Sequence, residues 1–143
     1  MDPVPAIGSA LEFVQRLEQV TNAHDLDALV DCFAVDYVNE TPAHPARGFT
    51  GQGQVRTNWS LLFARVPDIQ VSVVRATADG DMLWSEWEMA GTTQEGGAHL
   101  MRGVIVFGVS GQRASWARFY LEPVVVDDIG ADDAVRRQID GGS

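Results

Sequence analysis

The sequence predicts an α+β domain in which helices cover one face of a strongly curved, mostly antiparallel sheet. Apolar residues recur with helical spacing over roughly the first third of the chain, and from Val66 onward they alternate with the period of two that is typical of strands. The alternating runs are longer than the usual strand, which favours strong twist and curvature. Helices followed by a meander of strands form an α+β layout, in which the helices bury the apolar face of the sheet.

Three N-terminal helices are expected. Ser9 followed by Glu12 is a capping-box pattern, and apolar residues continue with helical spacing as far as Asn22. Asp25 is a suitable N-cap for a second, short helix, which must contact the first because the turn between them is very short. A third helix is expected over about residues 51–64.

One short strand is expected before the third helix, and four longer strands joined by hairpin turns are expected after it. The expected strand ranges are 36–41, 69–78, 82–91, 98–108 and 113–126. Residues 9–126 then form one domain, and residues 127–143 form an acidic tail with weak helical character.

The composition is that of one soluble globular domain, with 143 residues of which 45% are hydrophobic and 21% charged. A net charge of −10 argues against nucleic acid or an anionic membrane as a partner, since both require a basic surface. No apolar run is long enough to cross a bilayer, and the N-terminus lacks the basic start of a signal peptide. We therefore expect a cytoplasmic protein.

Metal and cofactor chemistry find no support in the sequence. Cys32 is the single cysteine, and it is expected as a small buried side chain among apolar neighbours. The 3 histidines lack the spacing of metal ligands, and no glycine-rich phosphate-binding pattern is present. We expect no metal site and no cofactor.

The segment Asp36–Trp59, DYVNETPAHPARGFTGQGQVRTNW, carries the strongest indication of a site. Its strand directs Tyr37, Asn39 and Thr41 to one face, because strand side chains alternate. The chain then turns through prolines and glycines into an amphipathic helix. We expect this elbow to form the mouth of a pocket.

The order of elements, together with the motifs DYVNETP, GFTGQGQVRTNW and SWARFYLEPV, resembles the nuclear-transport-factor-2-like superfamily. The resemblance is strongest to its SnoaL-like branch, which includes polyketide cyclases and limonene epoxide hydrolases. It implies a cystatin-like α+β barrel that forms a cone, and homodimers that associate through their sheets. It does not settle function, because the superfamily holds isomerases, cyclases, hydrolases, dehydratases and non-catalytic binders.

Limonene epoxide hydrolases position water with a tyrosine and an asparagine that Tyr37 and Asn39 resemble. Their acid–arginine–acid set does not carry over, because Trp87 and Met89 stand where that family has arginine and aspartate. An epoxide hydrolase of that mechanism is therefore not expected. Alternatively, Tyr37 and Asn39 form a hydrogen-bonded pair that stabilises the elbow.

The hairpin turns assign the faces of the long strands. They place Glu88, Arg102 and Tyr120 abreast on a mixed face that also carries Trp84 and Trp116. The opposite face is more apolar and is expected to meet the helices. Exposed tryptophans beside arginines favour a homodimer through the mixed face. The alternative is an acid–base cluster on that face formed by Glu86, Glu88, Arg118 and Glu122.

Proton transfer, if the protein is an enzyme, is assigned to His44 or Glu122, with Tyr37 and Asn39 in support. Glu122 resembles the acid that closes the last strand in SnoaL-like proteins, and a bulge would bring it into the pocket. His44 is otherwise an exposed loop residue, and His24 is expected at the surface.

The pocket wall is expected to be apolar with few polar groups. Its candidate ligand-binding residues are Trp59, Trp87, Met89, His99, Met101 and Phe119. Trp59 is alternatively a core residue, and His99 is either a hydrogen-bonded core residue or the one titratable group of the pocket.

Three functions are consistent with these patterns. The first is cofactor-free cyclisation, isomerisation or dehydration of a hydrophobic polyketide- or terpenoid-like substrate in the cone. The second is a non-catalytic ligand-binding or accessory subunit with the same pocket. The third is an interaction module whose cone is filled by its own side chains.

Overall fold

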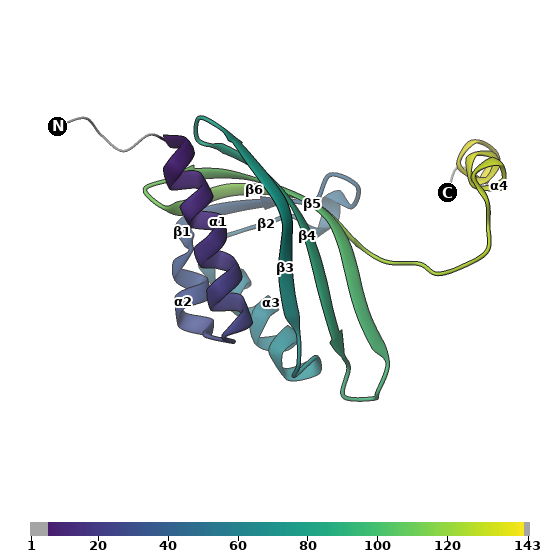
Figure 1. The fold of residues 1–143 in the computed structure, drawn as a ribbon, viewed down its shortest axis with the longest axis horizontal. Coiled ribbons are helices and arrows are strands. Elements are labelled where there is room, and N and C mark those ends of the chain that lie inside the picture. The colour runs from purple at the N-terminus through teal and green to yellow at the C-terminus, as the bar shows by residue number, and fades with distance from the viewer. Residues whose placement is uncertain (1–5, 142–143) are drawn as a thin grey trace.

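The computed structural model describes residues 6–141. Three helices pack against one side of a curved sheet (Figure 1). The helices are α1 (Ala6–Asn22), α2 (Leu26–Asp31), α3 (Gln52–Arg65) and α4 (Ala131–Arg136), with a 3-10 turn η1 (Pro45–Arg47) and a π turn η2 (Arg137–Gly141). The strands are β1 (Phe33–Glu40), β2 (Phe49–Thr50), β3 (Gln70–Asp79), β4 (Met82–Thr92), β5 (Ala98–Ser110) and β6 (Arg113–Pro123).

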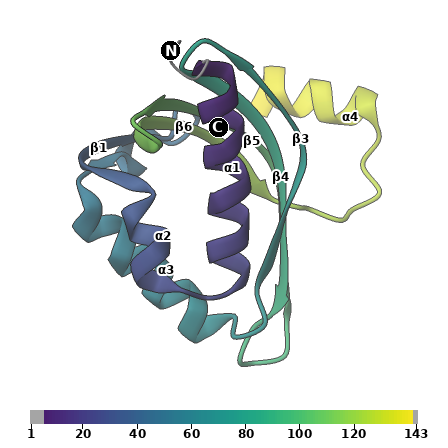
Figure 2. The same ribbon diagram turned by 60° about the vertical axis from the view of Figure 1, so that its left-hand side comes forward.

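The six strands form one open, mixed sheet in the order β2-β1-β6-β5-β4-β3. All neighbours are antiparallel except β1 and β6, which are parallel. The sheet bends around the helices, and α1, α2 and α3 lie on its concave side (Figure 2). The predicted α+β cone with three N-terminal helices is confirmed. The short strand β2 was not predicted.

The predicted pairing of β4 with β5 is confirmed, since Glu88 lies opposite Arg102. The predicted pairing of β5 with β6 is wrong by two residues, because Arg102 lies opposite Glu122 and not opposite Tyr120. A bulge between Gly108 and Val109 contributes to this displacement. An even shift keeps every side chain on its face, so the assignment of the faces holds.

The inner face of the sheet and the helices share one apolar core. Phe13 of α1 packs edge to face on Phe107 of β5, with ring centroids 5.1 Å apart. Leu83, Trp87 and Phe107 are fully or almost fully buried on this face. Cys32 belongs to the same core, and burial raises the pKa of its thiol.

The helix boundaries differ from the predicted ones where local signals compete. The first helix begins at Ala6, upstream of the Ser9–Glu12 pattern, so that pattern does not mark its start, and the side chain of Ser9 lies outside the described part. Asp25 caps α2 as predicted, since its Oδ1 accepts from the Ala28 amide over 3.1 Å. The third helix begins at Gln52, after Gly51.

The free edge of β3 is covered by polar side chains of α1. Glu18 Oε2 accepts from the Val73 amide over 2.7 Å. Asn22 bonds both backbone groups of Val71, accepting from its amide over 2.7 Å and donating to its carbonyl over 2.9 Å. Edge-strand groups that would otherwise face solvent are thereby satisfied.

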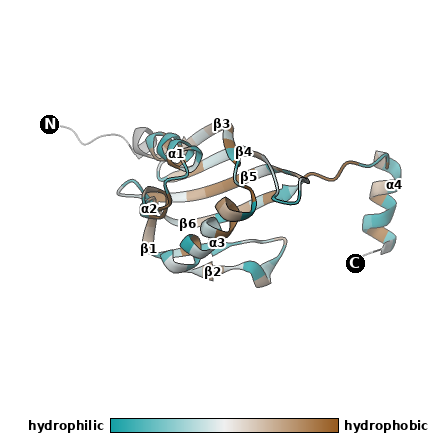
Figure 3. Ribbon diagram, turned by 90° about the horizontal axis from the view of Figure 1, so that it is seen from below, coloured by the Kyte–Doolittle hydropathy of each residue, from teal (hydrophilic) through white to brown (hydrophobic). Residues whose placement is uncertain are grey.

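The chain leaves the sheet after Pro123, earlier than the predicted end of the last strand at residue 126. An extended, apolar segment then carries α4 away from the domain body (Figure 3). Val125 and Val126 in this segment are exposed. Within residues 6–141, no helix combines the length and the hydropathy that a membrane crossing needs.

Candidate functional site

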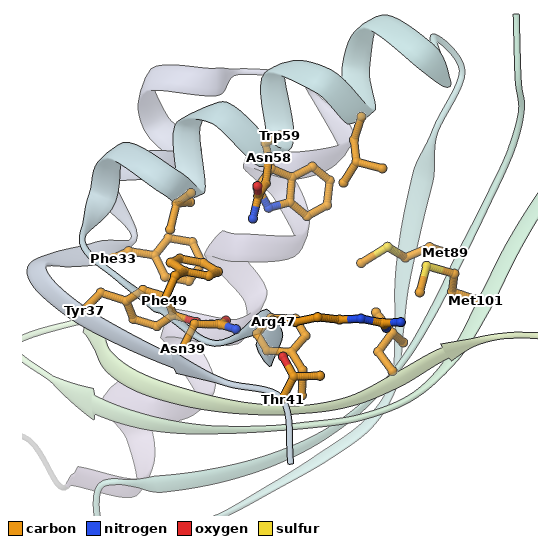
Figure 4. Close-up of a pocket in the computed structure, with 14 residues that line it drawn as sticks. Phe33, Tyr37, Asn39, Thr41, Arg47, Phe49, Asn58, Trp59, Met89 and Met101 are labelled. Atoms are coloured by element: carbon orange, nitrogen blue, oxygen red, sulfur yellow. The ribbon is translucent and has the colours of Figure 1, made fainter. Parts of the chain in front are cut away.

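A cavity of about 260 Å³ opens between α3, the elbow after β1 and the inner face of the sheet (Figure 4). Its wall is formed by Phe33, Tyr37, Asn39, Thr41, Arg47, Phe49, Val55, Asn58, Trp59, Leu62, Met89, Met101, Phe119 and Leu121. A smaller hollow of about 30 Å³ shares Phe33, Trp59, Met89 and Phe119 with it and reaches toward the core. The 260 Å³ of the larger cavity is slightly below the range of about 300–1,000 Å³ typical of small-molecule pockets.

The elbow is a hairpin loop that holds two side chains at the cavity. Strands β1 and β2 pair antiparallel, with Asn39 opposite Phe49, so residues 41–48 form a hairpin loop between them. Gly51, with φ 92°, then turns the chain into α3 while its amide donates to the Tyr37 carbonyl over 2.7 Å. This positive φ favours glycine. The loop positions Thr41 and Arg47 on the cavity wall.

Tyr37 and Asn39 form a buried pair on the wall. The Tyr37 hydroxyl donates to Asn39 Oδ1 over 2.7 Å. The Tyr37 ring packs edge to face between Phe33, at 4.8 Å, and Phe49, at 6.0 Å. Burial raises the pKa of Tyr37 well above its ordinary value, so the phenol stays protonated at neutral pH and is no proton acceptor.

The ligand-binding residues proposed from the sequence lie at different depths. Trp59, Met89, Met101 and Phe119 line the cavity. Trp87 lies deeper, lines only the smaller hollow, and its Nε1 donates to Ser85 Oγ over 2.8 Å. His99 shares the inner face with Met101 but does not line the cavity, and its Nε2 is buried without a hydrogen-bond partner.

His44 and Glu122 are brought together, 78 residues apart in sequence, with His44 Nε2 2.7 Å from Glu122 Oε1. Neither lines the cavity. Glu122 lies opposite Arg102 on the outer face of the sheet, while its neighbour Leu121 points into the cavity. The register irregularity of β5 and β6 lies far from Glu122, so no bulge there turns the carboxylate inward.

The outer face carries separate ion pairs and no acid–base cluster of the predicted composition. Arg75 Nε lies 2.9 Å from Glu86, and Arg102 Nε lies 3.0 Å from Glu88. Arg118 lies opposite Val106 and not beside Glu86. Trp84 is 49% exposed on this face.

His24 was placed wrongly from the sequence, and several residues of the cavity wall, Arg47 and Asn58 among them, were not proposed. His24 was expected at the surface, but it is half-buried, stacks on Phe63 at 4.5 Å and bonds the Ile69 carbonyl over 2.7 Å. Arg47 was not proposed as a site residue, although it lines the cavity. Arg47 lies in a loop, where the sequence has no helical or strand periodicity from which the direction of its side chain could be predicted. In the described part of the chain, no three His, Cys, Asp or Glu side chains gather as a metal site.

The described residues thus form an open α+β cone with a largely apolar cavity under its helices. The chain belongs to the SnoaL-like domain family, whose model matches residues 14–119. The resemblance stated from the sequence motifs is thereby confirmed. No curated protein sequence matches the chain at a significant level.

Solved structures share this fold at low sequence identity. A candidate SnoaL-like polyketide cyclase from Jannaschia sp. CCS1 has a TM-score of 0.70 and 18% identity, covering 85% of this chain and 91% of that one. An LEH-like epoxide hydrolase from Mycobacterium tuberculosis has a TM-score of 0.71 and 21% identity, covering 82% and 86%. Rv0760c from Mycobacterium tuberculosis, in complex with estradiol-17beta-hemisuccinate, has a TM-score of 0.67 and 20% identity, covering 78% and 92%.

Proposed function

We propose that this protein binds a small hydrophobic molecule in the cavity under α3. The observation that carries the proposal is the cavity wall itself, which is mainly aromatic and aliphatic with a few polar groups at one side. Trp59, Met101 and Phe119 offer flat or adaptable apolar surface to a ligand. The complex of Rv0760c with a steroid ester supports the idea that this fold can hold hydrophobic molecules.

Among the described residues that line the cavity, none is a carboxylate or an imidazole. The one phenol on the wall, Tyr37, has a raised pKa, and its hydroxyl donates a hydrogen bond to Asn39. General acid–base catalysis needs a group that exchanges protons near neutral pH. This composition favours a binding or accessory protein over a cyclase or isomerase that works inside the cavity.

A second candidate function is proton-transfer catalysis at the cavity mouth, with His44 as the base and Glu122 as its orienting partner. It is favoured by their 2.7 Å contact, which is the geometry of a carboxylate that orients a histidine. His44 also lies between Thr41 and Arg47, which both line the cavity. Substrates would be hydrophobic molecules of the polyketide or terpenoid kind.

The experiment that tests binding compares a cavity-filling variant with a matched variant on the outer face. Leu121 lines the cavity and Tyr120 is exposed on the opposite side of the same strand. A panel of one- and two-ring apolar compounds is screened by thermal unfolding. A ligand at 100 times its Kd stabilises a protein by about 2.7 kcal/mol, which raises the Tm of a domain of this size by roughly 9 °C.

Leu121→Trp should lose this shift, because the new indole occupies the ligand's space, whereas Tyr120→Trp should keep it. Equal shifts in the two variants would place binding outside the cavity, and no shift for any compound would count against a hydrophobic ligand.

A further inference from the structure

The cavity wall contains one charged side chain, Arg47, in the part of the chain that the structure describes. Five other arginines form ion pairs with carboxylates in the described part of the chain, among them Arg56, 2.9 Å from Asp27, and Arg102, 3.0 Å from Glu88. Arg47 has neither an ion pair nor a side-chain hydrogen bond to any described residue. In Figure 4 the Arg47 side chain extends across the cavity toward Met101.

The neutral polar groups of the wall also present hydrogen-bond donors. Asn39 Oδ1 is occupied by the Tyr37 hydroxyl, and Asn58 Oδ1 is occupied by Gln54 Nε2 over 2.8 Å. Each asparagine therefore has its amide nitrogen left over, and Figure 4 shows both nitrogens directed into the cavity. An amide nitrogen and a guanidinium donate and do not accept. The wall is thus rich in donors and lacks a carboxylate to accept from a ligand.

We propose that the ligand of this cavity is a hydrophobic acid, with an apolar body and one anionic oxygen end such as a carboxylate. The carboxylate bonds the Arg47 guanidinium and the free amide nitrogens, and the apolar body lies on Trp59 and Phe119. This inference rests on the proposed binding function and adds the chemical class of the ligand.

Physical chemistry favours this match over a neutral ligand. A carboxylate that leaves water for an apolar wall needs an opposite charge and hydrogen bonds to offset its lost hydration. A guanidinium meets a carboxylate with two parallel N–H donors and remains charged at every relevant pH. A neutral hydrocarbon would leave Arg47 without a partner and would gain nothing from the donors.

The test is calorimetric titration of the full chain at pH 7 with two matched probe pairs. The first pair is 2-naphthylacetate with 2-naphthylacetamide, and the second is cyclohexylacetate with cyclohexylacetamide. Each pair keeps the apolar body and removes the charge. The wild type should bind the acids roughly 10-fold or more tighter than the amides, because charge-assisted bonds are worth about 1.5–3 kcal/mol. Raising the salt concentration should narrow this difference.

Arg47→Gln should weaken the binding of the two acids by roughly 10-fold and change the affinities of the two amides by less than about twofold. The matched control is Arg118→Gln, which removes the same charge from an exposed residue that does not line the cavity. It should leave all four affinities unchanged, so any general effect of net charge is subtracted. Arg47→Lys keeps the charge but loses the planar pair of donors, and it should fall between the wild type and Arg47→Gln.

The outcomes separate the two proposals. Amides that bind as tightly as acids, or acids that bind Arg47→Gln as tightly as the wild type, would overturn the acid inference and leave the binding function standing. Loss of acid affinity in both Arg47→Gln and Arg118→Gln would also overturn it, because only net charge would matter. Failure of all four probes, together with the apolar panel, would contradict the binding function itself.

Discussion

Tyr37 donates its hydroxyl proton to Asn39 Oδ1 over 2.7 Å, and this bond fixes which end of the asparagine faces the cavity. The two residues stand two positions apart on β1, so both point to the same side of the strand. The phenol lies at 1% exposure behind the amide. The pair therefore acts as a unit in which Tyr37 orients Asn39 on the cavity wall.

The raised pKa of Tyr37 predicts an alkaline loss of stability that this one residue causes. In the unfolded chain the phenol ionises near its ordinary pKa of about 10. In the folded chain it stays protonated to higher pH, so the folded state binds more protons above pH 10 and its free energy of unfolding falls as pH rises. The free energy of unfolding of Tyr37→Phe, measured by urea unfolding, should decline less steeply than that of the wild type between about pH 9.5 and 11.5.

Tyr120→Phe is the control for this experiment, because Tyr120 is the second of the 2 tyrosines and is 42% exposed. In that variant phenolate absorbance should appear only together with unfolding. Phenolate absorbance from a still folded Tyr120→Phe variant would contradict the burial of Tyr37.

The position of His44 and Glu122 predicts that ligand affinity does not depend on them. Neither residue lines the cavity, and each is roughly 40% exposed, with side-chain values of 37% and 42%. His44→Ala and Glu122→Gln should each change the Kd of a cavity ligand by less than about twofold. If an activity is found, the same variants should lower its rate by roughly 10²–10⁴ with little change in affinity. A large loss of affinity with no effect on rate would show that the pair shapes the pocket and does no chemistry.

The contact of Trp116 with Gly108 predicts that Gly108 does not tolerate a side chain. The two residues are cross-strand partners, and the Trp116 indole lies where a Cβ atom on Gly108 would be. Gly108→Ala should cost roughly 1–3 kcal/mol in urea unfolding, because the indole must move. Gly53 is the control, since nothing lies within 4 Å of a Cβ built there and it lies in a helix. Gly53→Ala should stabilise the protein by about 0.4–1 kcal/mol. Equal effects at the two glycines would show that the indole does not cover Gly108.

Association through the outer face of the sheet remains a prediction. Trp84 is 49% exposed and Tyr120 is 42% exposed on this face, which is unusual for a surface that stays in water. Trp84→Glu should shift the protein from dimer to monomer in sedimentation at micromolar concentration, because it puts an unpaired charge into the interface. Val35→Glu, at a residue that is 74% exposed on β1, should leave the dimer intact. A wild type that sediments as a monomer would end this prediction.

The sequence predicted those features that periodicity controls and missed those that a loop or a bulge controls. The faces of β4 and β5 followed from alternation and from a short turn, so Glu88 was placed correctly opposite Arg102. The bulge after Gly108 leaves no mark in the hydrophobic pattern, so β6 was displaced. Strand β2 has only two residues and is too short for a pattern.

The same distinction applies to the site. The spacing of Tyr37 and Asn39 predicted a shared face because both are on a strand. Arg47 lies in a 3-10 turn between two strands, where direction depends on the whole hairpin. His44 and Glu122 were both proposed as site residues. Their contact was not predicted, because it joins a loop to a strand end 78 residues away in the sequence.

The polar cover that α1 places over β3 has a consequence for assembly. Glu18 and Asn22 occupy the backbone groups that an incoming strand would need at Val71 and Val73. At the other end of the sheet, β2 offers only two residues for pairing. Sheet extension by a neighbouring molecule thus has a short template at β2 and an occupied one at the Val71–Val73 part of β3, which disfavours strand-by-strand aggregation at these two places.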